Sequence, residues 1–333
     1  MSAAIRARTF APAMVPELVD LWNTAAGKWF PLRERLFRQN AIDDPHFDPA
    51  GCIVAIGVDS DRAVGFCLAK VARVPLGADG LRADRGWISM LAVLPDRQRS
   101  GIGTALLRAA EAFLRDRGRR RFVLGTGPAH FFPGVPDLLG TAPFFQSCEY
   151  VLRGHAYDLW RPLDGYRTPA AVAETVAAHP DLEIRALRPG EEAALLAFLD
   201  ATFPGAWRYT AAHFLDGGGP IGDFMALVGG GAVLGFAHVF PPDAHWIGPS
   251  IAWAAPAGAE GPASKRVGGL GPMGISPALR GRGLGLALLD RAMVHLAAAG
   301  AAEMFVDWTV LLDFYGKLGF VPYRRYHHGE RQI

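Results

Sequence analysis

The sequence predicts an α+β (mixed α/β) protein made of two tandem domains of the same design, and three observations carry that prediction. The chain has 333 residues, more than a single hydrophobic core usually serves. The order of its expected strands and helices is repeated in the second half. In each copy a strand leads into a glycine-rich turn and an amphipathic helix. We therefore expect domains over residues 1–160 and 183–333, joined by a linker over residues 161–182 that contains a short helix.

Matching elements recur in the same order in both halves. The first half opens with a short strand at Ile5 followed by a helix through Trp22, and the second half opens in the same way at Ile184, 179 residues after Ile5. Each half then contains two apolar runs joined by turn residues, the pattern of a β-hairpin. These runs are residues 53–58 and 63–71 in the first half, and residues 224–228 and 232–240 in the second. Equal order and near-equal spacing indicate an internal duplication.

Composition excludes several classes of protein. Half of the residues are hydrophobic and a fifth are charged, which is typical of well-packed globular domains. The net charge of +2 gives no whole-molecule case for binding nucleic acid or a membrane surface, and no apolar run reaches the ~18 residues of a membrane-spanning helix. The three cysteines have no CxxC spacing, so neither a disulfide framework nor a zinc site is indicated. We expect a cytoplasmic protein without a metal, nucleic-acid or membrane partner.

The binding chemistry is expected at two glycine-rich loops, residues 98–104 and 280–286. At each loop a strand ends, a proline turns the chain, and glycines precede an amphipathic helix. Glycine lets the backbone approach a ligand closely, and the first N–H groups of a helix have no internal partner and favour an anion. A diphosphate suits such a site. Neither loop has the third glycine of a dinucleotide-binding fingerprint or the Gly-Lys-Ser/Thr ending of a Walker loop.

Both loops resemble the acetyl-CoA-binding motif of the GCN5-related N-acetyltransferase (GNAT) superfamily, Q/R-x-x-G-x-G/A after a strand. Gln98, Gly101 and Gly103 match it in the first half, as Arg280, Gly283 and Gly285 do in the second. The resemblance implies a splayed mixed sheet, acetyl-CoA as the cofactor, and cofactor contacts from each loop and from the strand before it. The contacts so implied are Leu91, Val93, Gln98, Arg99, Ser100, Gly101, Ile102, Gly103 and Thr104 in the first half, and Met273, Ile275, Arg280, Gly281, Arg282, Gly283, Leu284, Gly285 and Leu286 in the second.

The halves differ where this family places its proton donor. Residues 314–320, FYGKLGF, resemble the family's ending, in which the tyrosine protonates the departing CoA thiolate, so Tyr315 is the expected catalytic acid. The other interpretation of Tyr315 is an aromatic residue that packs the last helix on the sheet. In the first half Phe145 falls at this place and cannot donate a proton. The first domain is therefore inactive, uses another donor, or only binds CoA.

A general base is needed to take a proton from the attacking amine. The sequence offers Asp307 on the strand expected beside the thioester, His238 on a hairpin strand, and Glu303. We expect Asp307 to act as the base. A lone histidine on an apolar strand and acidic residues on strands also have structural explanations, and the family also uses chains of water.

The first half carries 12 extra positions between its glycine loop and Phe145, around residues 125–136. The aromatic residues of this insertion either contact a substrate or cap the domain interface. Residues 130–136, HFFPGVP, are similar to tandem acetyltransferases found with bacterial cell-wall amino-sugar enzymes, which places amino sugars among the candidate acceptors.

The resemblance implies acetyl transfer from acetyl-CoA to a primary amine of a small molecule, mainly in the C-terminal domain. Two alternatives stay open: a CoA-binding sensor or assembly module without turnover, and an acyltransferase for a thiol-cofactor precursor. The acceptor, the acyl chain length and the oligomeric state, a homodimer included, are left undetermined by the sequence.

Overall fold

The structure is a computed structural model that describes residues 5–244, 246–254 and 266–333. The chain divides into two compact units, and each is described by itself. Unit 1 comprises Met1–Pro75, Gly80–Ala156 and Arg324–Ile333, and unit 2 comprises Leu76–Asp79 and Tyr157–Tyr323. Among the described residues, no helix has the length and apolar character needed to cross a bilayer.

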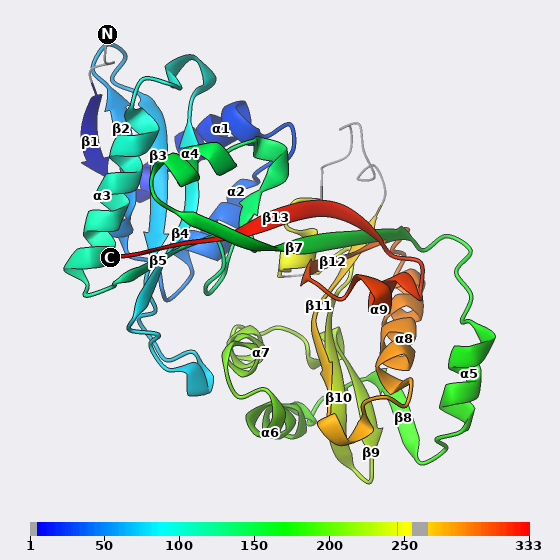
Figure 1. The fold of residues 1–333 in the computed structure, drawn as a ribbon. Coiled ribbons are helices and arrows are strands. Elements are labelled where there is room, and N and C mark those ends of the chain that lie inside the picture. The colour runs from blue at the N-terminus through cyan, green and yellow to red at the C-terminus, as the bar shows by residue number, and fades with distance from the viewer. Residues whose placement is uncertain (1–4, 245, 255–265) are drawn as a thin grey trace. The chain divides into compact units, whose positions relative to one another are not determined.

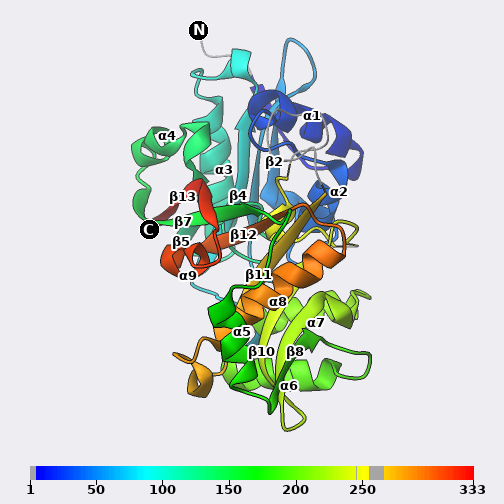
Figure 2. The same ribbon diagram turned by 90° about the vertical axis from the view of Figure 1, so that its right-hand side faces the viewer.

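Unit 1 is a mixed sheet in the order β1-β2-β3-β4-β5-β13, with β6 paired to β13 (Figures 1 and 2). On β3, Cys67 and Ala69 belong to the core that α3 completes, whereas Phe66 packs edge-on against Phe37 of α2. Because neighbouring strand residues point to opposite faces, these helices cover opposite sides of the sheet. The strands are β1 (Ile5–Thr9), β2 (Cys52–Gly57), β3 (Ala63–Lys70), β4 (Arg85–Val93), β5 (Arg121–Leu124), β6 (Val135–Pro136) and, from residue 324 on, β13 (Val321–Gln332). The helices are α1 (Val15–Ala26), α2 (Glu34–Phe37), α3 (Ile102–Asp116) and α4 (Ala142–Ser147).

Unit 2 repeats the plan in the order β7-β12-β11-β10-β9-β8. Apolar residues of α8 fill the core on one face, and residues of α6 and α7 pack with Phe224 and Phe236 on the other (Figure 1). The strands are, from residue 157 on, β7 (Val151–Pro162), and β8 (Leu182–Ala186), β9 (Phe224–Gly229), β10 (Ala232–Phe240), β11 (Val267–Ile275) and β12 (Glu303–Thr309). The helices are α5 (Ala170–Ala177), α6 (Glu192–Thr202), α7 (Ala206–Asp216), α8 (Leu284–Ala298) and α9 (Leu312–Gly316). Both hairpins predicted from the sequence are present, as β2-β3 and β9-β10.

The two units differ from the linear division expected at residues 160 and 183. The end of β13 pairs antiparallel with β5, through Gly329↔Leu124, so the last residues of the chain belong to unit 1. The segment 161–182 contains the expected short helix, α5, but it is an integral part of unit 2. Val172 of α5 is buried in the unit 2 core, and the Tyr166 hydroxyl donates to the buried Asp290 carboxylate of α8 at 2.5 Å.

Candidate functional site

In each unit two parallel strands part beside the glycine loop. β4 pairs with β5 as far as Ile88↔Leu124 and then continues beside β3. β11 pairs with β12 as far as Leu270↔Val306 and then continues beside β10. Past these points one edge of β4 and of β11 has no parallel partner strand among the described residues, which leaves room for a ligand beside the backbone.

Each glycine loop starts a helix at the mouth of the opening. Gly101 is the N-cap of α3 with φ of 87°, and Gly283 is the N-cap of α8 with φ of 77°. Both values lie in the left-handed region, which glycine adopts without strain. Within the described chain no side chain caps either helix, so the first N–H groups of both helices can bind an anion.

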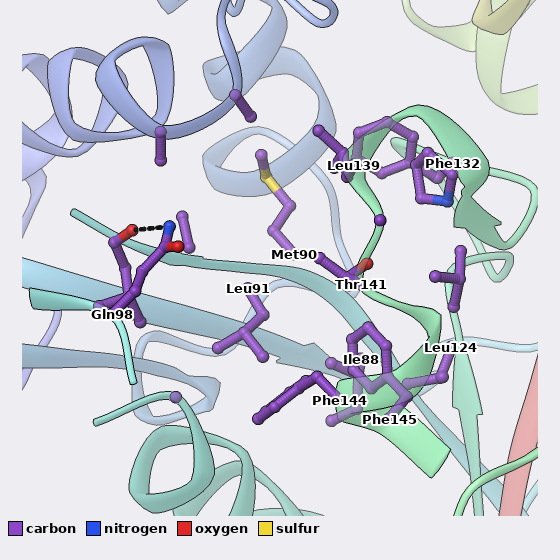
Figure 3. A pocket seen from close by; sticks show the side chains of 18 of the residues that line it. Ile88, Met90, Leu91, Gln98, Leu124, Phe132, Leu139, Thr141, Phe144 and Phe145 are labelled. Atoms are coloured by element: carbon purple, nitrogen blue, oxygen red, sulfur yellow. Dashed lines mark hydrogen bonds between the residues drawn. The ribbon is translucent and has the colours of Figure 1, made fainter. Parts of the chain in front are cut away.

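In unit 1 the opening continues into a cavity of about 740 Å³, a size typical of ligand sites (Figure 3). Its walls come from α1, β4, the glycine loop, the insertion and α4. Met90 and Leu91 leave β4 on opposite sides, and Leu91 points toward Phe144 and Phe145. Of the described residues that line the cavity, Arg99 alone is charged, and none has a carboxylate or an imidazole.

Most of the residues predicted to contact the cofactor in unit 1 line this cavity: Leu91, Val93, Gln98, Arg99, Gly101, Gly103 and Thr104. The Ile102 side chain is 2% exposed and packs in the core, so only its backbone is available to a ligand. Ser100 donates its hydroxyl to the Arg97 carbonyl at 2.6 Å. Gln98 donates its amide to the Val93 carbonyl at 3.1 Å, the dashed line in Figure 3. These two contacts hold the shape of the loop.

The surroundings of Gly103 in unit 1 recur around Gly285 in unit 2. A Cβ atom on Gly103 would lie 3.5 Å from the Phe144 ring, and one on Gly285 would lie 3.7 Å from the Phe314 ring. The next nearest side chain is that of the last strand residue before the loop, Val93 for Gly103 and Ile275 for Gly285. The remaining predicted contacts in unit 2 divide into exposed loop residues, Arg280, Gly281 and Arg282, and residues that pack against or within the core, Met273, Ile275, Leu284 and Leu286.

One side of the second glycine loop is covered. A Cβ atom on Gly283 would lie 3.1 Å from the Thr175 side chain of α5, whereas nothing described lies within 4 Å of such an atom on Gly101. Gly281 is likewise open. The Cβ side of Gly283 is therefore in contact with α5, while Gly281 and Gly283 both stay exposed to solvent.

Unit 2 brings together the predicted acid and base. Tyr315 is 5% exposed, and burial raises the pKa of its hydroxyl, with the negative charge of Asp307 adding to the rise. Asp307 directly follows Val306, the last residue of β12 paired with β11. Its Oδ1 atom lies 2.5 Å from the place that a Cβ on Gly271 would take. The carboxylate therefore lies where the strands part, and the nearby hydroxyl stays protonated at neutral pH.

The aromatic cluster around Tyr315 has a counterpart in unit 1. The Tyr315 ring packs with Phe314 and Phe320, at centroid distances of 5.0 and 5.8 Å. Phe145 packs in the same way with its own two aromatic neighbours, at 5.2 and 5.9 Å. A phenyl ring therefore packs with similar geometry at the corresponding position of unit 1, and the two clusters differ by the Tyr315 hydroxyl.

The other two candidate bases are placed differently. Glu303 begins β12, four residues and about 13 Å from Asp307 along the strand. The ring of His238 stacks on Phe224 at 4.2 Å and packs against Phe240 at 4.3 Å. Burial lowers the pKa of His238 to about 3, so its imidazole is neutral. His238 therefore has the packing position expected of a lone histidine on an apolar strand.

The insertion of unit 1 forms part of the cavity wall. Phe132 lines the cavity and packs against Trp22 and Phe30, with centroid distances of 5.8 and 5.1 Å. The buried Lys70 ammonium holds the preceding turn by donating to the Ala129 carbonyl at 3.3 Å, and it pairs with Asp44 at 2.6 Å. Phe132 of the insertion thus packs within unit 1 and bounds its cavity. Two further residues lie at the openings, Ser89 and Gly271, and neither belongs to a motif that would identify it from the sequence.

A family model described as the acetyltransferase (GNAT) family matches residues 15–132 and 193–320 of the chain. Curated relatives include the mycothiol acetyltransferase of Sanguibacter keddieii, 27% identical over 266 residues that make up 76% of this chain and 75% of the relative. The mycothiol acetyltransferase of Parafrankia sp. is 31% identical over 258 residues, 71% of this chain and 74% of the relative.

Solved structures share the fold across the chain. One is the GCN5-related glucosamine N-acetyltransferase region of a fungal multi-domain beta-N-acetylglucosaminidase, with a TM-score of 0.87, 24% identity and 99% of this chain covered; this chain spans 38% of that longer protein. Another is a tandem GNAT protein from the clavulanic acid biosynthesis pathway, with a TM-score of 0.65, 17% identity, and coverage of 99% of this chain and 98% of that one.

Proposed function

Because the chain belongs to the acetyltransferase (GNAT) family, whose members are acyl-CoA-dependent transferases, we propose that it acetylates a primary amine of a small molecule and that unit 2 carries out the transfer. The family, the mixed α/β fold with tandem domains, and acetyl-CoA as the cofactor were all expected from the sequence and are confirmed by the family match and the tandem structural neighbours. The acceptor and the division of labour between the units are the proposal.

The residues of both openings fit acetyl-CoA. The backbone N–H groups behind Gly101 and Gly283 would hold the diphosphate, and the free edges of β4 and β11 would bind the amides of the pantetheine arm. Exposed Arg280 and Arg282 would add positive charge at the second loop. When bound, acetyl-CoA supplies the activated acetyl thioester.

The single observation that carries the assignment to unit 2 is the pairing of Asp307 with Tyr315 at one opening. The Asp307 carboxylate accepts a proton from the acceptor amine, which makes the nitrogen nucleophilic. The Tyr315 hydroxyl, kept protonated by its burial and by the charge of Asp307, donates its proton to the departing sulfur. Unit 1 has Phe145 at the place of Tyr315, and no carboxylate among the described residues of its cavity. We assign unit 1 to binding rather than transfer.

An aromatic surface beside the unit 2 opening supports an acceptor that contains a sugar ring. Gly274 of β11 faces away from the α8 side of the sheet, and the Phe203 ring packs against it. The ring of Trp207, 38% exposed, lies 4.7 Å from that of Phe203. A sugar ring can place its apolar face on such an indole. The names of the relatives, for mycothiol and for glucosamine, favour an amino sugar or the amine of a thiol-cofactor precursor.

The test is a mixture of the protein and acetyl-CoA with a panel of amines: glucosamine, a cysteine-conjugated amino sugar and a simple alkyl amine. We expect release of free CoA thiol that depends on the acceptor, and an acetylated product by mass spectrometry. If acetyl-CoA binds but no amine releases CoA, the chain is a CoA-binding module and the proposal is wrong.

A further inference from the structure

Ser89 of β4 is a buried polar residue that the fold alone does not explain. It is 4% exposed, and its hydroxyl has no hydrogen-bond partner among the described residues. Leaving a buried hydroxyl without a partner costs about 1–3 kcal/mol of stability. Ser89 also lines the unit 1 cavity, so a ligand there could supply the missing partner.

The position of Ser89 directs it to the opening. The register of β3 and β4 runs Leu68↔Met90 and Ala69↔Ile88, so Ser89 is an extra residue, a β-bulge, on β4. Bulges turn a side chain out of the regular alternation and are frequent beside functional sites. Ile88 is the last residue of β4 paired with β5. Ser89 is therefore the first residue of β4 beyond the point where the strands part.

Unit 2 has the reverse arrangement at the corresponding positions. The offset of 182 residues that relates the two glycine loops places Gly271 at the Ser89 position and Asp307 at the Gly125 position. In unit 2 the Asp307 carboxylate from β12 fills the space in front of Gly271. In unit 1 the polar side chain comes from β4, and the residue on the β5 side is Gly125. Each opening thus has one polar side chain and one glycine, a carboxylate in unit 2 and a neutral hydroxyl in unit 1.

We propose that Ser89 is a ligand-binding residue that donates its hydroxyl hydrogen to the carbonyl oxygen of an acyl thioester bound in unit 1, so that this unit distinguishes acetyl-CoA from free CoA. The inference rests on the proposed acetyl-CoA site of unit 1. A hydroxyl can donate to a carbonyl, whereas an ionised carboxylate cannot. Free CoA ends in a thiol and lacks that carbonyl, so the hydrogen bond forms only with the acylated ligand.

The test uses the full chain with Gly285→Asp, which places a negative charge in the diphosphate site of unit 2, so that binding is read from unit 1. The affinities for acetyl-CoA and CoA are measured by calorimetry before and after Ser89→Ala. We expect Ser89→Ala to lower the preference for acetyl-CoA over CoA about three- to tenfold, the usual contribution of one neutral hydrogen bond. Ser89→Thr keeps the hydroxyl and should keep the preference. The melting temperature of the unliganded Ser89→Ala protein should equal or exceed that of its parent, because an unpartnered buried hydroxyl is removed.

Ser147→Ala is the matched control. Ser147 lines the same cavity, but its hydroxyl already donates to the Phe144 carbonyl at 2.7 Å. Its loss should change the affinities for acetyl-CoA and CoA alike and leave their ratio as it was. If Ser89→Ala lowers the melting temperature and keeps the ratio, Ser89 has only a structural role and the inference is overturned. If neither ligand binds the parent protein, the proposed unit 1 site itself fails, a result distinct from an unchanged ratio.

Discussion

An aspartate introduced at the start of α3 or of α8 allows the two proposed cofactor sites to be tested one at a time. Gly103 and Gly285 are the second residues of α3 and α8. A Cβ atom at these positions would have its nearest neighbours at 3.5 and 3.7 Å, ordinary contact distances, so Gly103→Asp and Gly285→Asp both fit. Acidic residues in the first turn suit the helix dipole, so both variants should stay folded.

The same carboxylate enters the site proposed for the diphosphate. Two like charges 4 Å apart repel by about 1 kcal/mol in bulk water and about 4 kcal/mol near a protein surface. With a factor of ten for each ~1.4 kcal/mol, the affinity for CoA at the altered site should fall by about fivefold to roughly a thousandfold. The two substitutions are chemically identical and differ only in the unit that they change.

Calorimetric titration with CoA reads both sites in one protein. Wild type should bind two equivalents, each single variant should lose one, and the double variant should bind neither in the same range. Turnover with an amine acceptor should be lost with Gly285→Asp. If the Gly285→Asp protein keeps wild-type turnover, the transfer does not occur in unit 2. If both variants bind CoA as wild type does, the glycine loops are not the anion sites.

Two further predictions concern stability. Gly101→Ala and Gly283→Ala should each lower the free energy of unfolding by about 1–2 kcal/mol, because alanine is strained at positive φ. Denaturant unfolding should show the larger decrease for Gly283→Ala, because its new methyl group would lie 3.1 Å from a threonine of α5. Equal decreases would contradict the contact of α5 with the loop. Burial raises the pKa of Asp223 to about 6, so the folded protein holds a proton there that the unfolded chain releases near pH 4, and stability falls as pH rises from about 4 through 6. Asp223→Asn should therefore stabilise the protein by about 1–3 kcal/mol at pH 7 and leave its stability unchanged near pH 4; no gain in melting temperature at pH 7 would refute the argument.

Features that depend on local sequence could be predicted. The glycine loops were recognisable because a helix N-cap with positive φ selects glycine, and Gly101 and Gly283 both have that conformation. The hairpins followed from apolar runs joined by turn residues. The difference between Tyr315 and Phe145 followed from aligning the repeated elements. In each case the controlling interactions lie within a few residues.

Features that depend on distant partners could not be predicted. The end of β13 pairs with β5. Several strands have a similar composition, so no local sequence pattern specifies which of them β13 pairs with. Ser89 and Gly271 were missed because a serine or glycine inside a strand gains meaning only when the register reveals the bulge. The contact of Thr175 with Gly283 depends on how α5 packs against α8, which the sequence of the linker does not show.

The central claim is that the Tyr315 hydroxyl completes acetyl transfer in unit 2, and the Tyr315→Phe variant tests it most directly. The variant should fold, since unit 1 already holds Phe145 in an equivalent aromatic cluster. With a productive amine acceptor, we expect kcat to fall about 100- to 10,000-fold, the usual contribution of a general acid, while the affinity for acetyl-CoA changes little. Wild-type kcat for Tyr315→Phe at every pH would contradict the claim.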